Sequence, residues 1–429
     1  SSAEFGVGHT VRELTGMFAF ALLDRQESTL YLARDRFGIK PLYWGFQEGF
    51  LFFGSELQAI RSLSFLNAGI DRDAVAAFIR SGYVPAPQSI LEGVKKVLPG
   101  TVLSFRSGGA MTVDKFWNLA DSLGTTAPPP SADATGDFLH ELDDLLSAAV
   151  GRRLVSDVPV GSFLSGGIDS SFVTALMVEQ SSSPVRTFSI GFEESDFNEA
   201  PFAAAIAKHL GTVHTELYVT AQDALDVVPM LSSVYDEPFA DSSQIPTLIL
   251  SRMTSEYVKV ALSGDGGDEI FGGYARYFDN ERLWRLSRWS KTLPGRLLTK
   301  FLVTQSEERL NRWAKAMPRS LYRADPGSKI REVLSWHPAY SRSDLYLRQL
   351  SHWPDPSLVI PATGEPLNAV EKVQAEQRIG DPFMWMQYVD INSYLPDDIL
   401  VKVDRASMTY GLEVRVPLLD HHAAEFVWS

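Results

Sequence analysis

Residues 163–172, FLSGGIDSSF, place two glycines, three serines and one aspartate between two apolar flanks. A simple turn needs one or two such residues, whereas a loop that wraps an anion needs most of them. Glycines allow consecutive backbone N–H groups to converge on an anion, and a helix that follows adds the positive end of its dipole. Whether a strand precedes this loop and a helix follows it therefore decides between these two interpretations, and it also indicates the fold.

Short apolar strands alternate with helical patterns on both sides of the loop. Apolar residues at helical spacing predict an amphipathic helix over 137–154, and the strand that follows covers 158–165. A helix is expected from about Ser170. Further along, the patterns predict strands at 185–192, 212–219 and 257–262, and helices at 198–211, 222–236 and 243–254. Such alternation predicts an α/β fold, a doubly wound parallel sheet covered on both faces. The chain from about residue 275 is expected to be mainly helical.

The residues that precede this α/β region have a different sequence pattern. Aromatic and aliphatic runs within 16–24, 28–35, 41–46, 49–56 and 98–105 are separated by turn-forming residues, which predicts a β-rich meander of α+β type. Residues 118–137 are rich in Ala, Ser, Thr and Pro and lack apolar periodicity, so they are interpreted as a linker. The expected division is therefore 1–117, a linker over 118–137, and 138–429.

Composition limits the classes of function. A net charge of -14 argues against a nucleic-acid-binding surface, because phosphate backbones are held by an excess of Lys and Arg. No apolar run approaches a membrane span and no signal peptide is visible, so we expect a cytoplasmic protein without a membrane partner. The 429 residues include no cysteine, which excludes disulfides, thiolate metal sites and a thiol nucleophile within them. The chain does not begin with Met, which points to a missing natural N-terminus.

Asp169 restricts the kind of ligand that the first loop can bind. Its carboxylate would repel a phosphate directly, so the loop makes sense for a phosphate only with a cation between the two groups. That combination indicates a Mg²⁺–nucleotide. The loop is not a Walker A motif, because no Gly-Lys dipeptide occurs in the chain. The alternative is a helix entry with serine capping; the density of hydroxyl groups favours phosphate.

A second glycine-rich loop, LSGDGGDEIFGGY at 262–274, follows the strand at 257–262. It places Asp265, Asp268 and Glu269 within five residues, and packed acids are costly unless a metal or shared protons neutralise them. The alternatives are a solvated acidic turn or a calcium loop, although the spacing is not that of an EF-hand. Since ligands bind at the carboxyl ends of parallel strands, both loops are expected to form one Mg²⁺–triphosphate site.

The two loops together resemble the synthetase domain of the glutamine-dependent asparagine synthetases. Residues 394–421, YLPDDILVKVDRASMTYGLEVRVPLLDH, resemble a third stretch of that family, and LTGMFAFALLD, RDRFGIKPLYW and GSELQAI resemble the later half of its N-terminal glutaminase domain. The resemblance implies a partial N-terminal-nucleophile glutaminase sandwich followed by an ATP-pyrophosphatase domain. It also implies small-molecule substrates; the oligomeric state stays open, with a homodimer as one option.

The resemblance implies a role for each matching residue. Ser165, Gly167, Asp169 and Ser170, in the loop that also contains Gly166, would hold the β- and γ-phosphates of ATP. Adenosine would contact Leu164, Ile190, Ser263 and Gly264, and Mg²⁺ would be bound by Asp169 and Asp268. Asp265 would be catalytic, in a place where better-known members carry Glu, and this shorter side chain leaves the acceptor open. The implied reaction activates a carboxylate, in the first place aspartate, as an acyl-adenylate and amidates it with ammonia from glutamine. The alternatives are another carboxylate such as a sugar uronic acid, or a nucleotide-binding homologue without turnover.

Two expected features of the family are missing from these residues. The N-terminal Cys of its glutaminase is absent, and so is a Lys that lies beyond the last matching motif, so we interpret the chain as truncated at both ends. Three further groups have structural interpretations. The Arg34–Asp35–Arg36 run is expected to be a structural ion-pair cluster, Asp404 and Arg405 to lie in a helix that supports the site, and His421 and His422 to lie at the surface.

Overall fold

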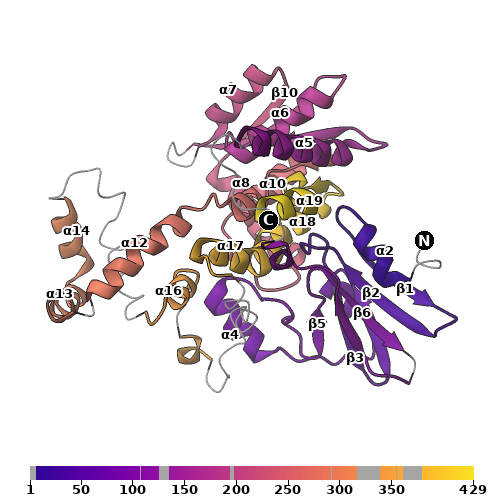
Figure 1. The fold of residues 1–429 in the computed structure, drawn as a ribbon, viewed down its shortest axis with the longest axis horizontal. Coiled ribbons are helices and arrows are strands. Elements are labelled where there is room, and N and C mark those ends of the chain that lie inside the picture. Colours follow the sequence, from indigo (N-terminus) through magenta and orange to yellow (C-terminus); the bar gives the residue numbers. More distant parts are fainter. Residues whose placement is uncertain are drawn as a thin grey trace.

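The computed structural model describes residues 6–106, 108–124, 135–193, 198–290, 292–315, 339–353, 355–360 and 379–429. A β-rich N-terminal part, in indigo and purple, packs beside a larger C-terminal part built around a parallel sheet (Figure 1). Half of the expected linker, residues 125–134, lies outside the described residues.

The C-terminal sheet has five strands in the order β10-β9-β8-β11-β12, and every pair in it is parallel. This result confirms the predicted parallel α/β sheet. The strands are β8 (Val160–Phe163), β9 (Arg186–Phe192), β10 (Val213–Val219), β11 (Val260–Leu262) and β12 (Glu413–Arg415). Strand β12 was not predicted: it joins the sheet only because the chain returns from more than 140 residues away and pairs Glu413–Arg415 with β11.

Both faces of this sheet are covered, as a doubly wound fold requires. Leu262 packs with apolar residues of α5 (Thr135–Leu154) and α6 (Ile168–Gln180), whereas its neighbour Ala261 packs on the other face with α10 (Gln244–Ser255) and α18 (Leu400–Met408). Helix α7 (Ala200–Leu210) contacts β9 and β10 and ends at Gly211. The helix predicted over 222–236 is interrupted: α8 (Ala221–Val227) and α9 (Leu231–Val234) flank a 3-10 turn that contains Pro229.

The N-terminal part contains two antiparallel sheets. The first has the order β1-β2-β6-β7 and the second β4-β3-β5. The strands are β1 (Ala19–Asp24), β2 (Thr29–Arg34), β3 (Tyr43–Gln47), β4 (Phe50–Gly54), β5 (Val94–Lys96), β6 (Thr101–Arg106) and β7 (Thr112–Lys115), and the helices are α2 (Val7–Glu13), α3 (Leu57–Arg61) and α4 (Arg72–Ser81). All five predicted strand regions contain a strand. Strands β5 and β7 and the helices were not predicted.

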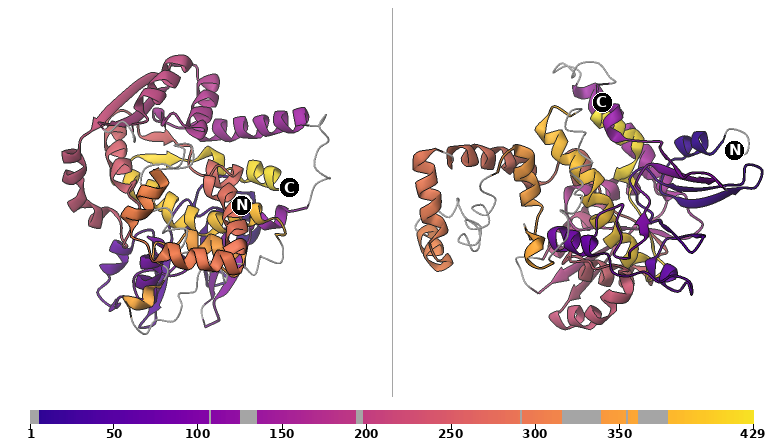
Figure 2. Two further views of the ribbon diagram at one scale, coloured as in Figure 1. Left: turned by 90° about the vertical axis from the view of Figure 1, so that its left-hand side faces the viewer. Right: turned by 90° about the horizontal axis from the view of Figure 1, so that it is seen from below.

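The chain after β11 is mainly helical where it is described, as expected. Its remaining helices are α11 (Gly267–Phe271), α12 (Ala275–Ser290), α13 (Leu293–Val303), α14 (Glu307–Lys315), α16 (Arg342–Gln349), α17 (Pro382–Asn392) and α19 (His421–Trp428). Helix α12 leads away from the body of the molecule to α13 and α14, which form a projecting arm in both Figure 1 and the right-hand view of Figure 2. Within the described residues, no helix has both the length and the apolar character needed to cross a membrane.

The two parts share one core and several ion pairs. Phe37 and Ile39 pack in the same cluster as Leu395 of the C-terminal part. Lys40 Nζ lies 2.8 Å from Asp404 Oδ1, and Arg405 Nη2 donates to the Ser55 carbonyl at 2.6 Å. Asp404 and Arg405 therefore support the structure from α18, as expected, and they do so by holding the N-terminal part.

The start of the expected linker belongs to this junction. Residues Leu119–Ser122 form a 3-10 helix, and Leu119 is buried in the shared core. Asn118 accepts a hydrogen bond from the Tyr388 hydroxyl at 2.9 Å. Residues 118–124 are therefore packed at this junction, because a composition rich in small residues does not exclude packing by the few apolar ones.

Asp35 is buried directly after β2 and organises the turn there. Its carboxylate accepts hydrogen bonds from the backbone N–H groups of Phe18, Ile39 and Lys40. Arg34 donates to three carbonyl groups, those of Gly38, Lys40 and Val97. The cluster is structural, as expected, but backbone hydrogen bonds hold it.

Candidate functional site

A cavity of about 780 Å³ lies at the carboxyl ends of β8, β9 and β11. The predicted site residues that line it are Leu164, Ser165, Gly167, Asp169, Ser170, Ile190, Ser263, Gly264, Asp265 and Asp268. The two glycine-rich loops thus meet at the sheet edge where the strand order predicts a ligand. Gly166 is the one predicted residue that does not line the cavity.

Helix α6 begins at Ile168 directly after the first loop. No side chain caps this helix at its N-cap residue, Gly167. The serine hydroxyls instead fix the loop: Ser165 Oγ and Ser170 Oγ lie 2.9 Å apart, and the Gly167 N–H donates to Ser165 Oγ at 3.2 Å. Simple serine capping therefore does not account for the loop, and the free first turn of α6 faces the cavity.

Gly166 turns the loop rather than lining the cavity. Its φ of 84° lies in the left-handed region that favours glycine. A Cβ here would lie 2.8 Å from the Cβ of Phe202 and 2.9 Å from the backbone nitrogen of Ala203. Gly166 thus allows the first loop to pack closely on α7, which sets the position of the loop.

The second loop touches the first through its glycines. A Cβ on Gly267 would overlap the carboxylate of Asp169, and one on Gly264 would lie 2.7 Å from the backbone nitrogen of Ser170. Only hydrogen atoms fit at these two positions. Glycine at 264 and 267 therefore allows the acids of the two loops to share one cavity.

Three carboxyl groups interact electrostatically in this cavity. Burial and the charges of Asp268 and Asp265 raise the pKa of Asp169 to about 6. Burial also raises the pKa of Asp268 and that of Asp265, whose carboxylate accepts a hydrogen bond from Ser263 Oγ. Grouped carboxylates with raised pKa values gain from a nearby cation, and oxygen donors of this kind fit Mg²⁺.

Glu269, the fourth acid, has a different place. It is 1% exposed and accepts a hydrogen bond from the Tyr274 hydroxyl at 2.7 Å. Burial raises its pKa to about 7. Gln387 of α17 donates to the carbonyl groups of Glu269 and Ile270, both at 3.0 Å. The Glu269 side chain is therefore buried within the structure and does not line the cavity.

Sequence reasoning missed Lys402, which also lines the cavity. It lies on α18, is 8% exposed, and its Nζ donates to Asp241 Oδ2 at 2.6 Å. The partners are separated by 161 residues, so no local motif connects them. A lysine among apolar residues of a helix was the only available signal.

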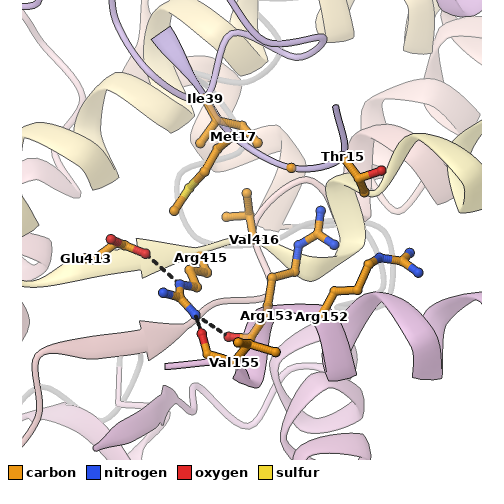
Figure 3. Close-up of a pocket in the computed structure, with 10 residues that line it drawn as sticks. Thr15, Met17, Ile39, Arg152, Arg153, Val155, Glu413, Arg415 and Val416 are labelled. Atoms are coloured by element: carbon orange, nitrogen blue, oxygen red, sulfur yellow. Dashed lines mark hydrogen bonds and ion pairs between the residues drawn. The ribbon is translucent and has the colours of Figure 1, made fainter. Parts of the chain in front are cut away.

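A second cavity of about 340 Å³ lies between the two parts (Figure 3). Met17 and Ile39 line it from the N-terminal part and Val416 from the C-terminal part. Arg415 and Glu413 also line it, and Arg415 Nε donates to Glu413 Oε1 at 2.6 Å, as the dashed line in Figure 3 marks. No local sequence pattern predicts this cavity, because its walls come from distant segments.

The two histidines at the start of α19 differ from expectation. His421 is 8% exposed, and burial together with the charge of Arg36 lowers its pKa to about 3, so the prediction of a surface position is wrong for this residue. Asp420, His421 and His422 are close enough to share a metal ion. However, Asp420 Oδ2 already accepts hydrogen bonds from Arg152 at 2.8 Å and Arg153 at 2.7 Å, and these cations disfavour a metal.

Comparison with known proteins agrees with this architecture. Residues 141–429 match the family model Asparagine synthase, and residues 2–117 match the model Glutamine amidotransferase domain. The chain is 31% identical over 409 residues to Asparagine synthetase [glutamine-hydrolyzing] 1 of Bacillus subtilis, covering 95% of this chain and 61% of that protein. It is 32% identical over 425 residues to a putative asparagine synthetase [glutamine-hydrolyzing] of Mycobacterium bovis, covering 96% and 60%.

A third relative, a putative asparagine synthetase [glutamine-hydrolyzing] 2 of Methanocaldococcus jannaschii, is 36% identical over 283 residues, covering 64% of this chain and 52% of that protein. The chain thus spans about three fifths of the length of the first two relatives. The parallel sheet with its two glycine-rich loops and the model match over residues 141–429 lead to one conclusion. The chain belongs to the asparagine synthase family.

Proposed function

We propose that this protein is the synthetase of an ATP-dependent amidotransferase, which activates a carboxylate as an acyl-adenylate and amidates it with ammonia. The observation that carries the proposal is the meeting of both glycine-rich loops, with Asp169, Asp265 and Asp268, in one cavity. The preferred acceptor is aspartate, as in the names of the relatives, and glutamine is the preferred source of ammonia.

In this proposal the first loop binds the β- and γ-phosphates of ATP. The Ser165 and Ser170 hydroxyls and the first turn of α6 supply donors, and the pair of hydroxyls at 2.9 Å is already arranged to face the cavity. Leu164, Ile190, Ser263 and Gly264 contact the adenosine. Asp169 and Asp268 would hold Mg²⁺, which supplies positive charge to the triphosphate.

Two steps follow on the α-phosphate side. A carboxylate oxygen of the acceptor attacks the α-phosphorus, the bond to the β-phosphate breaks, and pyrophosphate leaves. Ammonia then attacks the acyl carbon, the bond to AMP breaks, and one proton is released. Asp265 is suited to accept this proton, because burial raises its pKa while the Ser263 hydroxyl orients its carboxylate.

The interdomain cavity offers a path for ammonia. Its apolar side, formed by Met17, Ile39 and Val416, lies where the part that matches the glutamine amidotransferase model meets the synthetase part (Figure 3). The charged side chains of Arg152, Arg153, Glu413 and Arg415 also line the cavity. We propose that ammonia released in the first part crosses here. Ion pairs such as Lys40–Asp404 keep the two walls together.

Product analysis tests the proposal. The protein is incubated with Mg²⁺-ATP, ammonium and either aspartate or a sugar uronic acid, and phosphorus NMR identifies the nucleotide products. The proposal expects AMP and pyrophosphate in amounts equal to the amide formed with one of these acids. Steady formation of ADP and orthophosphate contradicts it. Nucleotide binding without any turnover would favour a non-catalytic homologue instead.

A further inference from the structure

The cavity contains several acids and one buried cation. Asp169, Asp265, Asp268 and Glu199 line it, and Lys402 is the one Lys or Arg among the residues described as lining it. A negatively charged acceptor that enters this cavity therefore meets a single fixed positive side chain. We propose that Lys402 determines acceptor specificity: its Nζ binds an anionic group of the acceptor other than the carboxylate that is activated. This inference rests on the proposed function.

The position of Lys402 separates it from the expected metal ligands. Asp169 and Asp268 come from the two glycine-rich loops, whereas Lys402 comes from α18, which packs on β12 and α10. Burial raises the pKa of Asp265, and the hydrogen bond from Ser263 and the charge of Lys402 partly oppose that rise. The charges of Asp268 and Asp265 act on Asp169. Asp265 is thus close enough to interact with both Lys402 and Asp169. Our proposal therefore puts the carboxylate that is activated beside Asp265 and the second anionic group of the acceptor at Lys402.

Asp241 holds the Lys402 ammonium group but accepts only one of its hydrogen bonds. Asp241 Oδ2 accepts from Lys402 Nζ at 2.6 Å, and Asp241 Oδ1 accepts from the Ser243 N–H at 2.7 Å. Asp241 is the one hydrogen-bond acceptor of Nζ among the described residues. Since an ammonium has three N–H donors, two remain for a ligand.

Asp398 completes the support of this ion pair. Burial and the charge of Asp241 raise the pKa of Asp398 to about 8, so its carboxyl group is largely protonated at neutral pH and can donate to Asp241. Asp241 therefore stays ionised and holds Lys402 Nζ in place. A charged donor fixed in this way suits recognition of a carboxylate, because the cost of ordering it is already met before the ligand binds.

A purely structural ion pair is the competing explanation, and variants distinguish the two. Lys402→Met removes the cation but leaves Asp241 buried without its partner, which threatens folding. The double variant Lys402→Met/Asp241→Asn removes both charges and is therefore the decisive one. Lys40→Met is the matched control, because Lys40 forms a similar pair with Asp404 of the same helix but does not line the cavity.

The readout compares aspartate with β-alanine, which is aspartate without its α-carboxylate. With ammonium as nitrogen source, the wild type should have a kcat/KM for aspartate roughly 30-fold or more above that for β-alanine. In the double variant this ratio should fall to about 3 or less, through a higher KM for aspartate, while the Kd of Mg²⁺-ATP changes less than about twofold. Lys40→Met should keep the wild-type ratio.

Three results overturn the inference. These are an unchanged ratio in the double variant, a loss confined to Mg²⁺-ATP affinity, or an acceptor that carries a single anionic group. If the wild type amidates nothing, the proposed function fails but the inference is still tested. Calorimetry then measures aspartate binding in the presence of Mg²⁺ and α,β-methylene-ATP, which cannot release pyrophosphate. Binding that needs Lys402 supports the assignment, and aspartate binding that is equal in the double variant, or absent from the wild type, rejects it.

Discussion

Gly267 and Asp169 bring the two glycine-rich loops into contact, because a Cβ on Gly267 would overlap the Asp169 carboxylate. The residues are far apart in the chain and come from different βα connections. The geometry of the proposed nucleotide site thus depends on glycine at position 267 as much as on the carboxylates of the two loops.

Replacing this glycine should displace Asp169. We expect Gly267→Ala to raise the Kd of Mg²⁺-ATP at least about tenfold, since a methyl group must push the carboxylate away or separate the loops. Calorimetric titration with Mg²⁺-ATP measures the effect. Gly136→Ala is the control, because a Cβ at Gly136 in α5 meets no atom within 4 Å. Equal affinity in Gly267→Ala and the control would show that the loops do not bind the nucleotide together.

Asp169 and Asp268 should act as a unit. Asp169→Asn and Asp268→Asn each remove one proposed ligand of the same cation, a loss of several kcal/mol of transition-state stabilisation. We expect each change to abolish most turnover and the double change to cost little more than either alone. Rates of pyrophosphate release for the three variants check this. Fully additive losses would mean that the two acids do not share a metal ion.

Buried His421 should make the fold sensitive to acid. Its pKa is about 3 in the folded protein, against an ordinary value near 6.5 in the unfolded chain. Between these values the unfolded chain binds one more proton, so this contribution is complete above about pH 6.5 and falls by about 1.4 kcal/mol per pH unit below it. His421→Gln should therefore flatten the dependence of the urea midpoint on pH between about 4 and 6.5.

The control for this prediction is His209→Gln, which changes an exposed histidine in the last turn of α7. Its slope should match that of the wild type. If His421→Gln also leaves the slope unchanged, His421 is already protonated in the fold and its burial has been misjudged.

Glutamine should not be hydrolysed by this 429-residue polypeptide. It contains no cysteine, whereas the glutaminase reaction implied by the family resemblance uses a cysteine thiol. We expect it to bind Mg²⁺-ATP but to release no glutamate from glutamine, as measured by a coupled glutamate assay. Glutamate above the level of a parallel preparation from cells without the protein would contradict this expectation.

Sequence patterns were sufficient to predict the strands, helices and loops that depend on neighbouring residues in the chain. The strands β8 to β11 and the helices between them follow from apolar runs and helical spacing, and the loops at 163–172 and 262–274 follow from their own composition. Their convergence at one sheet edge follows from the rule for parallel sheets.

The features that were missed depend on tertiary contacts. Strand β12 has three residues and exists only through its pairing with β11. The Lys402–Asp241 pair joins segments 161 residues apart, and His421 is buried by the junction with the N-terminal part near Arg36. No sequence pattern within a single segment predicts these contacts. The interruption of the helix predicted at 222–236 is different, because its cause, Pro229, is visible in the sequence.

Transfer of oxygen from acceptor to AMP tests the central claim most directly. The acceptor identified by product analysis is labelled with ¹⁸O in its carboxylate and supplied with Mg²⁺-ATP and ammonium. Attack of a carboxylate oxygen on the α-phosphorus predicts AMP with one ¹⁸O atom and pyrophosphate with none, as measured by mass spectrometry. Unlabelled AMP, or label in orthophosphate, would contradict an acyl-adenylate intermediate and with it this account of the site.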